Sequence, residues 1–324
     1  MILHLDNIVQ RTQLDTSERF DLALGFARPD DRSIKNLRDV ESKATQCWVY
    51  TLPPPAEQID TSVEQVQVRL QLGKFDKCTH RTWSDATSTQ EISAALMAMG
   101  RDSENRIFVD VSAFPRRILA AVLDAIRAAV ADGVLVNLTL AYRLAVFSRP
   151  SDRPAPANRR VAPVHRNMAG WPRAPGLPVH LIVGLGYERG KALGAVEYIQ
   201  PVHLSLFFPE SPEVRFAKQV QTRNHELLEV VREESVFHYP VMDPAAQFAL
   251  LSSLLQAMVT NSKPVLLPFG PKIFYAVCLL ISFRFSEVSV WHVSGEEDEP
   301  ASQVRPSSHV TFASLSLRAD SKAA

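Results

Sequence analysis

The stretch Val179-His-Leu-Ile-Val-Gly-Leu-Gly186 sets the architecture, because it reads as a buried strand that ends at glycines. Residues 188–199 follow with apolar residues at helical spacing, and residues 203–208 form a second apolar run that Pro209 closes. A strand, a helix and another strand in this order predict a parallel sheet with helices on its faces.

The same alternation runs through both halves of the chain. In the N-terminal half we expect strands at residues 20–26, 47–52, 75–83, 106–111 and 135–142. In the C-terminal half we expect further strands at residues 235–239, 263–267, 287–293 and 309–317. Apolar helices separate most of these runs, which predicts an α/β fold of two tandem Rossmann-like parallel-sheet sandwiches.

Residues 149–178 interrupt this rhythm. They contain 7 prolines and 2 glycines and show no apolar period, which is typical of a linker or of an arm laid over a surface. We therefore predict a first Rossmann-like domain at 1–148, a Pro/Arg-rich arm at 149–178 and a second Rossmann-like domain at 179–324.

The two halves match in the order of their elements and in the glycines and prolines that end them, which indicates an internal duplication. The first strand of each half ends near a glycine, Gly25 in one and Gly186 in the other. A late strand leads in each half to a proline and a basic residue that open an apolar helix, Arg116 in one and Lys272 in the other. The alternative is that any two Rossmann-like domains share this order of elements.

Composition limits the classes of function. Lys plus Arg and Asp plus Glu number 35 each, so a basic surface for nucleic acid or membranes could only be local. The 3 cysteines lie far apart and suggest a reducing compartment without disulfides. The N-terminus lacks the pattern of a signal peptide, and no apolar run reaches the ~20 residues of a membrane span. We expect a cytoplasmic protein that does not contact membranes.

The loop after the strand at 179–186 is the first candidate site. Gly186, Tyr187, Glu188 and Gly190 lie where a strand leads into a helix, and ligands of open parallel sheets bind at such carboxyl ends. Small residues let backbone N–H groups approach an anion at the helix N-terminus. The spacing from Gly184 is a relaxed dinucleotide fingerprint. The alternative is that these glycines serve only a tight turn.

The second candidate site is the loop Pro268-Phe-Gly-Pro-Lys272. Gly270 shapes a turn, and Lys272 stands in the first turn of a helix, where a lysine suits a phosphate. In the first half Arg116 holds the corresponding place, with Ser112 as a hydroxyl donor. The alternative for Lys272 is an ordinary solvated lysine.

These residues resemble CRISPR-associated Rossmann-fold (CARF) ligand sensors and their fused-pair relatives, the SAVED domains of bacterial antiphage systems. The resemblance rests on a strand ending Leu-Gly-Tyr-Glu188 and on the later turn with Gly270 and Lys272. It implies a cyclic oligonucleotide bound between two Rossmann-like units. The family's loop commonly reads Thr-Gly-Gly-Thr-Lys, so the hydroxyl residues are missing here.

No catalytic residue, metal site or cofactor is assigned from the sequence. We expect a non-enzymatic nucleotide sensor or adaptor subunit whose partner is an effector or other protein subunit, and which could contact nucleic acid through Arg159 and Arg160. The first alternative is a nucleotide- or nucleoside-processing enzyme that uses Asp110 or Glu188. The second is a purely structural interaction subunit.

Overall fold

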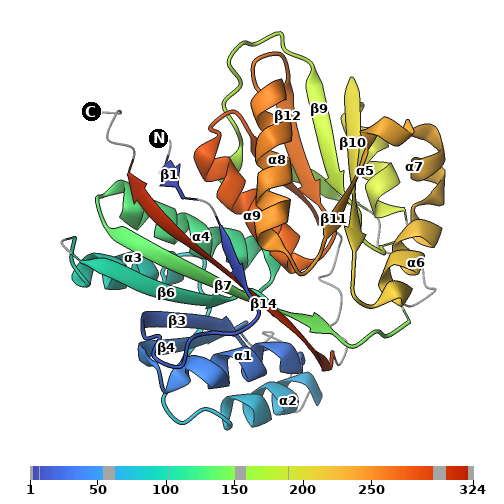
Figure 1. Cartoon of the computed structure of the whole chain (residues 1–324). Coiled ribbons are helices and arrows are strands. Elements are labelled where there is room, and N and C mark those ends of the chain that lie inside the picture. Colours follow the sequence, from blue (N-terminus) through green and yellow to red (C-terminus); the bar gives the residue numbers. More distant parts are fainter. Residues whose placement is uncertain are drawn as a thin grey trace. The chain divides into compact units, whose positions relative to one another are not determined.

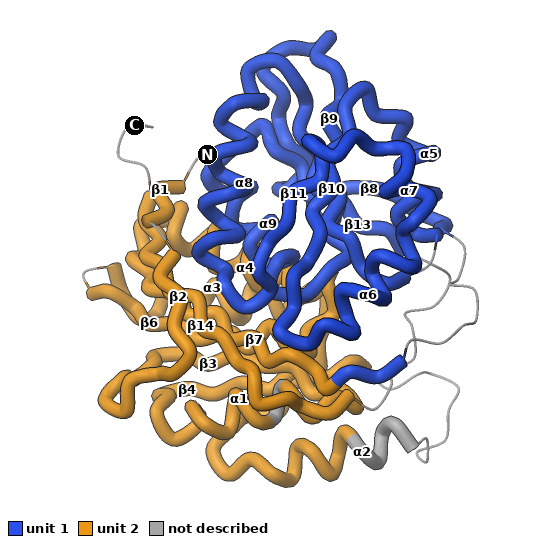
Figure 2. Tube along the Cα trace, turned by 45° about the vertical axis from the view of Figure 1, so that its right-hand side comes forward, with its two compact units in different colours: residues 1–2, 147–300 blue, residues 3–146, 301–324 orange. Residues whose placement is uncertain are grey.

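A computed structural model describes residues 3–6, 8–53, 63–101, 103–149, 158–188, 190–294 and 304–319. The chain forms two compact units, coloured separately in Figure 2. The N-terminal unit contains residues 3–146 and 301–324, and the inserted unit contains residues 147–300. The first predicted boundary therefore lies within two residues of the observed one, whereas the C-terminal segment belongs to a different unit from the one we expected.

The sheet of the N-terminal unit has a core of parallel strands in the order β5-β4-β3-β6-β7. Their bounds are β3 Phe20–Phe26, β4 Ala44–Thr51, β5 Thr79–Thr82, β6 Glu104–Asp110 and β7 Leu135–Ala145. Strand β14, Pro306–Ala319, pairs antiparallel with β7. The short strands β1, Leu3–Leu5, and β2, Val9–Arg11, pair with β14 in turn.

Helices cover both faces of this sheet (Figure 1). They are α1 Asp31–Glu41, α2 Val63–Leu72, α3 Ser88–Ala98 and α4 Arg116–Ala131. Helix α1 starts where the Asp30 carboxylate accepts from the Arg32 backbone N–H, and it packs Leu37 and Val40 into the core. Helix α4 follows β6 and buries a stripe that includes Leu119, with α3 beside it.

The sheet of the inserted unit repeats this plan with the order β11-β10-β9-β12-β13-β8. The parallel strands are β9 Val179–Gly184, β10 His203–Glu210, β11 Val236–Pro240, β12 Lys263–Pro268 and β13 Ser289–Ser294. Strand β8, Arg160–Pro163, pairs antiparallel with β13. The buried central strands are apolar on both sides, as expected for a sheet that is covered on both faces.

The helices of the inserted unit again lie on both faces (Figure 1). They are α5 Lys191–Ile199, α6 Val214–Arg223, α7 His225–Val230, α8 Pro244–Met258 and α9 Lys272–Arg284, with 3-10 turns at Arg166–Met168 and Glu233–Ser235. Nearly every residue of α9 is buried, in keeping with its apolar sequence. Both sheets thus confirm the predicted Rossmann-like α/β class.

The two sheets share one strand order and exchange their trailing strands. Numbered along each repeat, the parallel strands run 3-2-1-4-5 in both sheets. The strand that follows the first repeat, β8, completes the second sheet, and the strand that follows the second repeat, β14, completes the first. Each trailing strand pairs antiparallel with strand five, β13 or β7. A duplication of one module that exchanges its last strand accounts for this connectivity.

Hydrogen-bond register refines the predicted equivalences. Ala27 N donates to the Tyr50 carbonyl at 2.8 Å, and Leu185 N donates to the Phe207 carbonyl at 2.9 Å. These bonds equate Phe26 with Gly184, so Gly25 corresponds to Val183 and not to Gly186. The predicted equivalence of the helix starts agrees better with the structure. Arg116 and Lys272 each follow a proline, and the two prolines have closely similar torsions, φ −59° and ψ 140° against φ −54° and ψ 144°.

The cysteines correct a second expectation. Cys47 in β4 and Cys78 just before β5 form a disulfide with 4.5 Å between their Cα atoms, while Cys278 is free and buried. The prediction of a chain without disulfides was wrong, because neighbouring parallel strands bring together two cysteines that are 31 residues apart.

Candidate ligand site

The candidate site of the inserted unit lies at the carboxyl ends of β9 and β12. These neighbouring parallel strands lead into helices on opposite faces of the sheet, α5 after β9 and α9 after β12 (Figure 1). The strand order reverses between them, which makes this the position where open α/β sheets bind ligands. All the ligand residues predicted for this half lie in or beside the two loops.

A side-chain hydrogen bond fixes the β9–α5 loop at Gly186. The Asn224 side-chain amide, which is buried, donates to the Gly186 carbonyl at 2.7 Å and to the Val220 carbonyl at 2.8 Å. A Cβ on Gly186 would lie 2.8 Å from the Phe269 carbonyl oxygen and against the Glu188 carboxylate. Gly186 is therefore required by the close approach of the two loops.

Gly270 packs as closely from the other loop. A Cβ there would lie 2.8 Å from the Tyr239 hydroxyl and 2.9 Å from the Leu185 carbonyl oxygen. The sequence suggested that Gly186 brings the backbone close to an anion and that Gly270 shapes a turn, and the structure shows that both glycines let the two loops approach each other. Gly186 and Gly270 therefore each have a packing role, and their role in binding an anion stays a prediction.

Two helix N-termini at these loops lack a side-chain cap. Helix α5 starts at Lys191 after Gly190, which has φ 74°, and α9 starts at Lys272 after Pro271. Neither capping residue accepts from the first-turn N–H groups, and each helix begins with a half-buried lysine. Sequence reasoning missed Lys191, although a lysine directly after the last glycine of the loop was visible.

Acidic residues cap the other long helices of this unit. Glu213 accepts from the Arg215 N–H at the start of α6, and Asp243 accepts from the Ala246 N–H at the start of α8. A carboxylate at a helix start neutralises the partial positive charge there. Helices α5 and α9 instead combine that partial charge with a lysine, which favours an anion.

Tyr187 and Glu188 complete the loop. The Tyr187 side chain is 43% exposed and stacks on the Phe216 ring, with 6.4 Å between the ring centroids and 22° between the planes. The Glu188 side chain is half-buried and turns back against Gly186. All the predicted residues of this half lie in the two loops at the carboxyl ends of β9 and β12.

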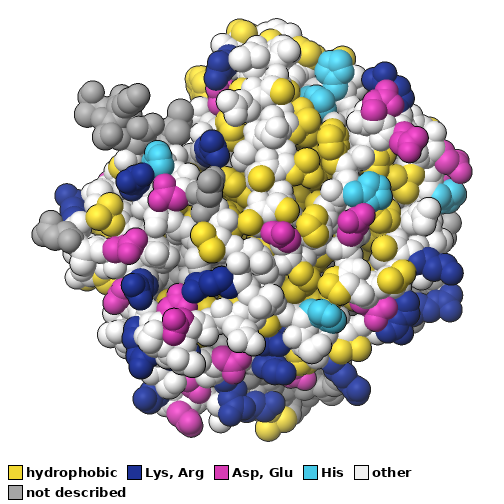
Figure 3. All heavy atoms as spheres, viewed as in Figure 1, with side chains coloured by type: hydrophobic (Ala, Val, Ile, Leu, Met, Phe, Trp, Pro, Cys, Tyr) yellow, Lys and Arg dark blue, Asp and Glu magenta, His cyan; other side chains and the backbone are white. Residues whose placement is uncertain are grey.

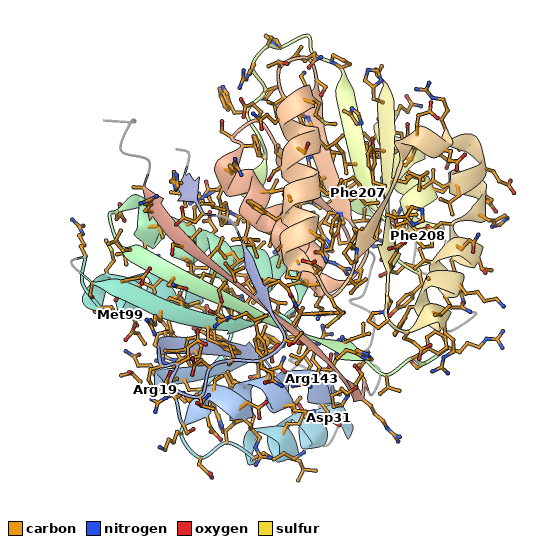
Figure 4. The ribbon with its side chains drawn as sticks, in the orientation of Figure 1. Arg19, Asp31, Met99, Arg143, Phe207 and Phe208 are labelled. Carbon is orange, nitrogen blue, oxygen red and sulfur yellow. A yellow bond between two sulfur atoms is a disulfide. The ribbon has the colours of Figure 1, made fainter. Side chains whose placement is uncertain are left out.

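The corresponding crevice of the N-terminal unit is filled by a buried polar network. Asp110 is fully buried and accepts from the Ser112 N–H at 2.9 Å and from the Asn36 amide at 3.2 Å. Arg143, labelled in Figure 4, donates from Nε to Asn36 Oδ1 at 2.8 Å, and its backbone N–H donates to Ser112 Oγ at 3.0 Å. Ser112 is fully buried in this network and cannot donate to a ligand in solvent.

Burial sets the charge state of this network. Desolvation raises the pKa of Asp110 from 3.8 to about 7, although hydrogen bonds from Ser112 and Asn36 oppose the rise. Desolvation also lowers the pKa of Arg143, against the attraction of Asp39 and Asp110. Such shifts arise where charged groups leave water, in structural networks as well as in active sites.

Protein groups also occupy the loop after β3. The Asp30 carboxylate pairs with the Arg32 guanidinium at 2.6 Å and caps α1, where the inserted unit has Gly190. Arg116, which was predicted to be equivalent to Lys272, is half-buried at the first position of α4. The Asp30 carboxylate therefore lies at the start of α1, where an anionic ligand would otherwise bind.

Other candidate features lie outside these crevices. A pocket of about 300 Å³ in the N-terminal unit is lined by Asp31, Lys35, Arg38, Asp39 and Lys74, of which Figure 4 labels Asp31. Its charges are mixed and assign no ligand. Within the described ranges, no group of three or more His, Cys, Asp or Glu side chains is placed to hold a metal ion.

The predicted nucleic-acid residues lie at the edge of the second sheet. Arg160 opens β8, the Arg159 backbone N–H donates to the Ser294 carbonyl at 3.0 Å, and both side chains are exposed. On the face drawn in Figure 3, Lys and Arg side chains are interspersed with Asp and Glu side chains. Among the described helices, none is long and apolar enough to cross a membrane.

Comparisons with known proteins add little. No protein-family model matches the chain, and no curated protein matches its sequence. A Pseudomonas aeruginosa UCBPP-PA14 protein described as a universal stress protein matches with a TM-score of 0.25 and 8% identity, over 86% of this chain and 94% of that one. The cytoplasmic domain of a prokaryotic cation chloride cotransporter matches with a TM-score of 0.20 and 10% identity, over 88% and 98%. At these TM-scores neither structure bears on function.

Proposed function

We propose that the inserted unit binds a phosphate-bearing ligand of the nucleotide type, and that the chain is a non-enzymatic sensor or adaptor subunit. One observation carries this proposal: α5 and α9 both begin at the strand-order reversal without a side-chain cap, and each begins with a lysine. Two helix N-termini and two lysines at the carboxyl ends of neighbouring strands favour a multiply charged anion.

The positions of the carboxylates support the non-enzymatic part of the proposal. The enzyme alternative would use Asp110 or Glu188 as a base. Asp110 is fully buried beneath its own hydrogen-bond partners, and a group out of reach of substrate cannot transfer its proton. Glu188 turns back against Gly186. Binding is the function that the remaining polar groups of the inserted unit support.

The wider assignment rests on the sequence resemblance to CARF and SAVED sensors. It extends the proposal to a cyclic oligonucleotide as ligand, to a bacterial antiphage complex as setting and to a partner protein that carries the effector activity. Nucleic-acid contact through Arg159 and Arg160 stays a prediction, with a steep loss of binding in salt as its signature.

Isothermal titration calorimetry against cyclic and linear nucleotides tests the proposal. Lys272→Ala and Lys191→Ala should each weaken binding by about one to two decades, because each removes a charge-assisted contact worth roughly 1.5–3 kcal/mol. Lys263→Ala is the matched control, since Lys263 opens the same strand at its other end, about 17 Å from the loop. Its affinity should equal that of the wild type.

Three outcomes would contradict the proposal. Binding of no phosphate compound by the wild type would leave the structural interaction subunit. Equal losses in the Lys263→Ala control and the two loop variants would place the ligand elsewhere. Binding followed by conversion of the nucleotide, seen by chromatography, would establish the enzyme alternative.

A further inference from the structure

An aromatic stack includes Tyr187 of the loop that leads into α5. Tyr187 stacks on Phe216, which lies in the first turn of α6. The Phe216 and Phe147 rings are T-shaped, with 5.1 Å between centroids and 76° between planes. Phe216 and Phe147 are half-buried, whereas Tyr187 is 43% exposed. A tyrosine that served only the core would bury more of its ring.

The stack is held in place from several sides. The buried Asn224 amide fixes the Gly186 carbonyl, which directly precedes Tyr187. Glu213 caps α6 and binds the Arg215 guanidinium at 2.6 and 2.8 Å, and that guanidinium lies 4.8 Å from the Phe147 ring centroid. A preorganised ring loses little conformational freedom when a flat ligand stacks on it.

We propose that the Tyr187 ring is the stacking surface for the base of a nucleotide whose phosphates lie at the N-termini of α5 and α9. This inference rests on the proposed function and adds the ligand class, a base-bearing nucleotide and not a sugar phosphate. Three residues separate Tyr187 from Lys191, so base and phosphate subsites share one loop. Stacking tolerates every base, because every base has a π-face.

A pair of ligands that differ only in the base tests this inference. The probes are adenosine 5′-monophosphate and ribose 5-phosphate, titrated into the full chain by calorimetry. The wild type should bind the nucleotide about 10-fold or more tightly than the sugar phosphate, the range that stacking on one aromatic side chain contributes.

Three variants locate the base. Tyr187→Ala should remove the preference for the nucleotide and leave the affinity for ribose 5-phosphate unchanged. Tyr187→Phe should keep the preference, because the ring and not the hydroxyl stacks. Tyr198→Ala is the matched control: that side chain is 70% exposed near the other end of α5, and the preference should persist.

The outcomes separate this inference from the proposed function. Equal wild-type affinity for both probes would overturn the stacking surface and leave the phosphate site standing. Equal loss of both probes in Tyr187→Ala would show that Tyr187 only shapes the loop. Failure of both probes, and of every other phosphate compound, would overturn the proposed function and the stacking surface together.

Discussion

The two crevices of this chain occupy the same place in the same topology and differ in content. In the N-terminal unit, Asp30 pairs with Arg32, and Asp110 lies buried with Asn36 and Arg143 nearby. In the inserted unit, glycines bring the loops together and lysines stand at uncapped helix starts. The first crevice thus contains buried carboxylates that accept from protein donors, whereas in the second two helices begin at a lysine that directly follows a glycine or a proline. The start of α4 shares this last feature, because Arg116 follows Pro115 without a side-chain cap.

The comparison extends to single positions. Strand register makes Asp110 of the N-terminal sheet the equivalent of Leu267 in the second sheet. Leu24 and Ile182 are equivalent, and they pair with Val109 and Leu266, the residues directly before Asp110 and Leu267. A buried carboxylate in one repeat is thus an apolar residue in the other. The topology tolerates both, because only the strand order is shared, and each crevice can take its own chemistry.

The exchange of trailing strands offers the largest test. Deleting residues 304–324 removes β14 and with it the buried side chains of Phe312, Leu315 and Leu317. Their burial contributes roughly 5–9 kcal/mol, comparable with the whole stability of a domain. We expect the N-terminal unit to unfold and the inserted unit to keep its structure.

Hydrogen–deuterium exchange followed by peptide mass spectrometry reads the two units separately. Amides of β6 and β7 should lose protection in the deletion variant, while those of β9, β10 and β12 keep it. A synthetic peptide of residues 304–319, added in trans, should restore the protection of the β7 amides. Loss of protection in the inserted unit instead would show that β14 completes the second sheet, as the predicted domain boundaries implied.

Asp110→Asn tests whether the first crevice is a structural core. The pKa of Asp110 is about 7 in the folded chain against 3.8 for an ordinary aspartate, so the folded state binds the extra proton between these values. Stability therefore falls as the pH rises from about 4 to about 7 and stays constant above. At pH 8 the variant should be more stable than the wild type by up to roughly 4 kcal/mol, with little difference at pH 4.

Urea denaturation between pH 4 and pH 8 measures this effect. Asp76→Asn provides the control, because it removes the same charge from an exposed position of the same unit. Its stability should follow that of the wild type at each pH. An Asp110→Asn chain that is less stable at pH 8 would show that Arg143 requires the negative charge, and the crevice would then be a paired ionic site.

Local sequence patterns were enough to find most strands and helices, because burial on both faces leaves continuous apolar runs such as residues 181–183 and 265–267. The pattern also located the helix starts at Arg116 and Lys272, where proline fixes the preceding torsion. These are short-range effects, and a single sequence records them.

Long-range pairing was not available from the sequence. Residues 309–317 were predicted as the last strand of the second domain, and only the full topology shows that they pair with β7. The network around Asp110 joins Asn36 and Arg143, which lie 107 residues apart in sequence and carry no shared motif. Lys191 was visible, but its role depends on the absence of a side-chain cap, which only the structure shows.

The disulfide distinguishes the two sheets further. Cys47 and Cys78 join β4 to the segment before β5, whereas Cys278 of the inserted unit is free. Replacing Cys78 by serine should lower the free energy of unfolding by about 2–4 kcal/mol, because the cross-link no longer restrains the unfolded chain. Denaturant unfolding with and without dithiothreitol measures this effect. The reductant should lower the free energy of unfolding of the wild type by the same amount and leave that of the variant unchanged. Alkylation of all three cysteines in unreduced, denatured protein would contradict the bond.

Gly270→Ala is the smallest test and addresses the loop contact itself. The corresponding loop of the N-terminal unit has Ala113, so a Cβ is tolerated there, while at Gly270 it would lie 2.8 Å from the Tyr239 hydroxyl and 2.9 Å from the Leu185 carbonyl. Displacing these groups should cost about 1–3 kcal/mol of stability, the usual range for overpacking. Gly176→Ala, where nothing lies within 4 Å of the added Cβ, should be neutral or slightly stabilising. Thermal unfolding of both variants compares them. Equal stability would mean that the two loops can move apart, and that the crevice of the inserted unit is no more closely packed than the alanine-bearing one.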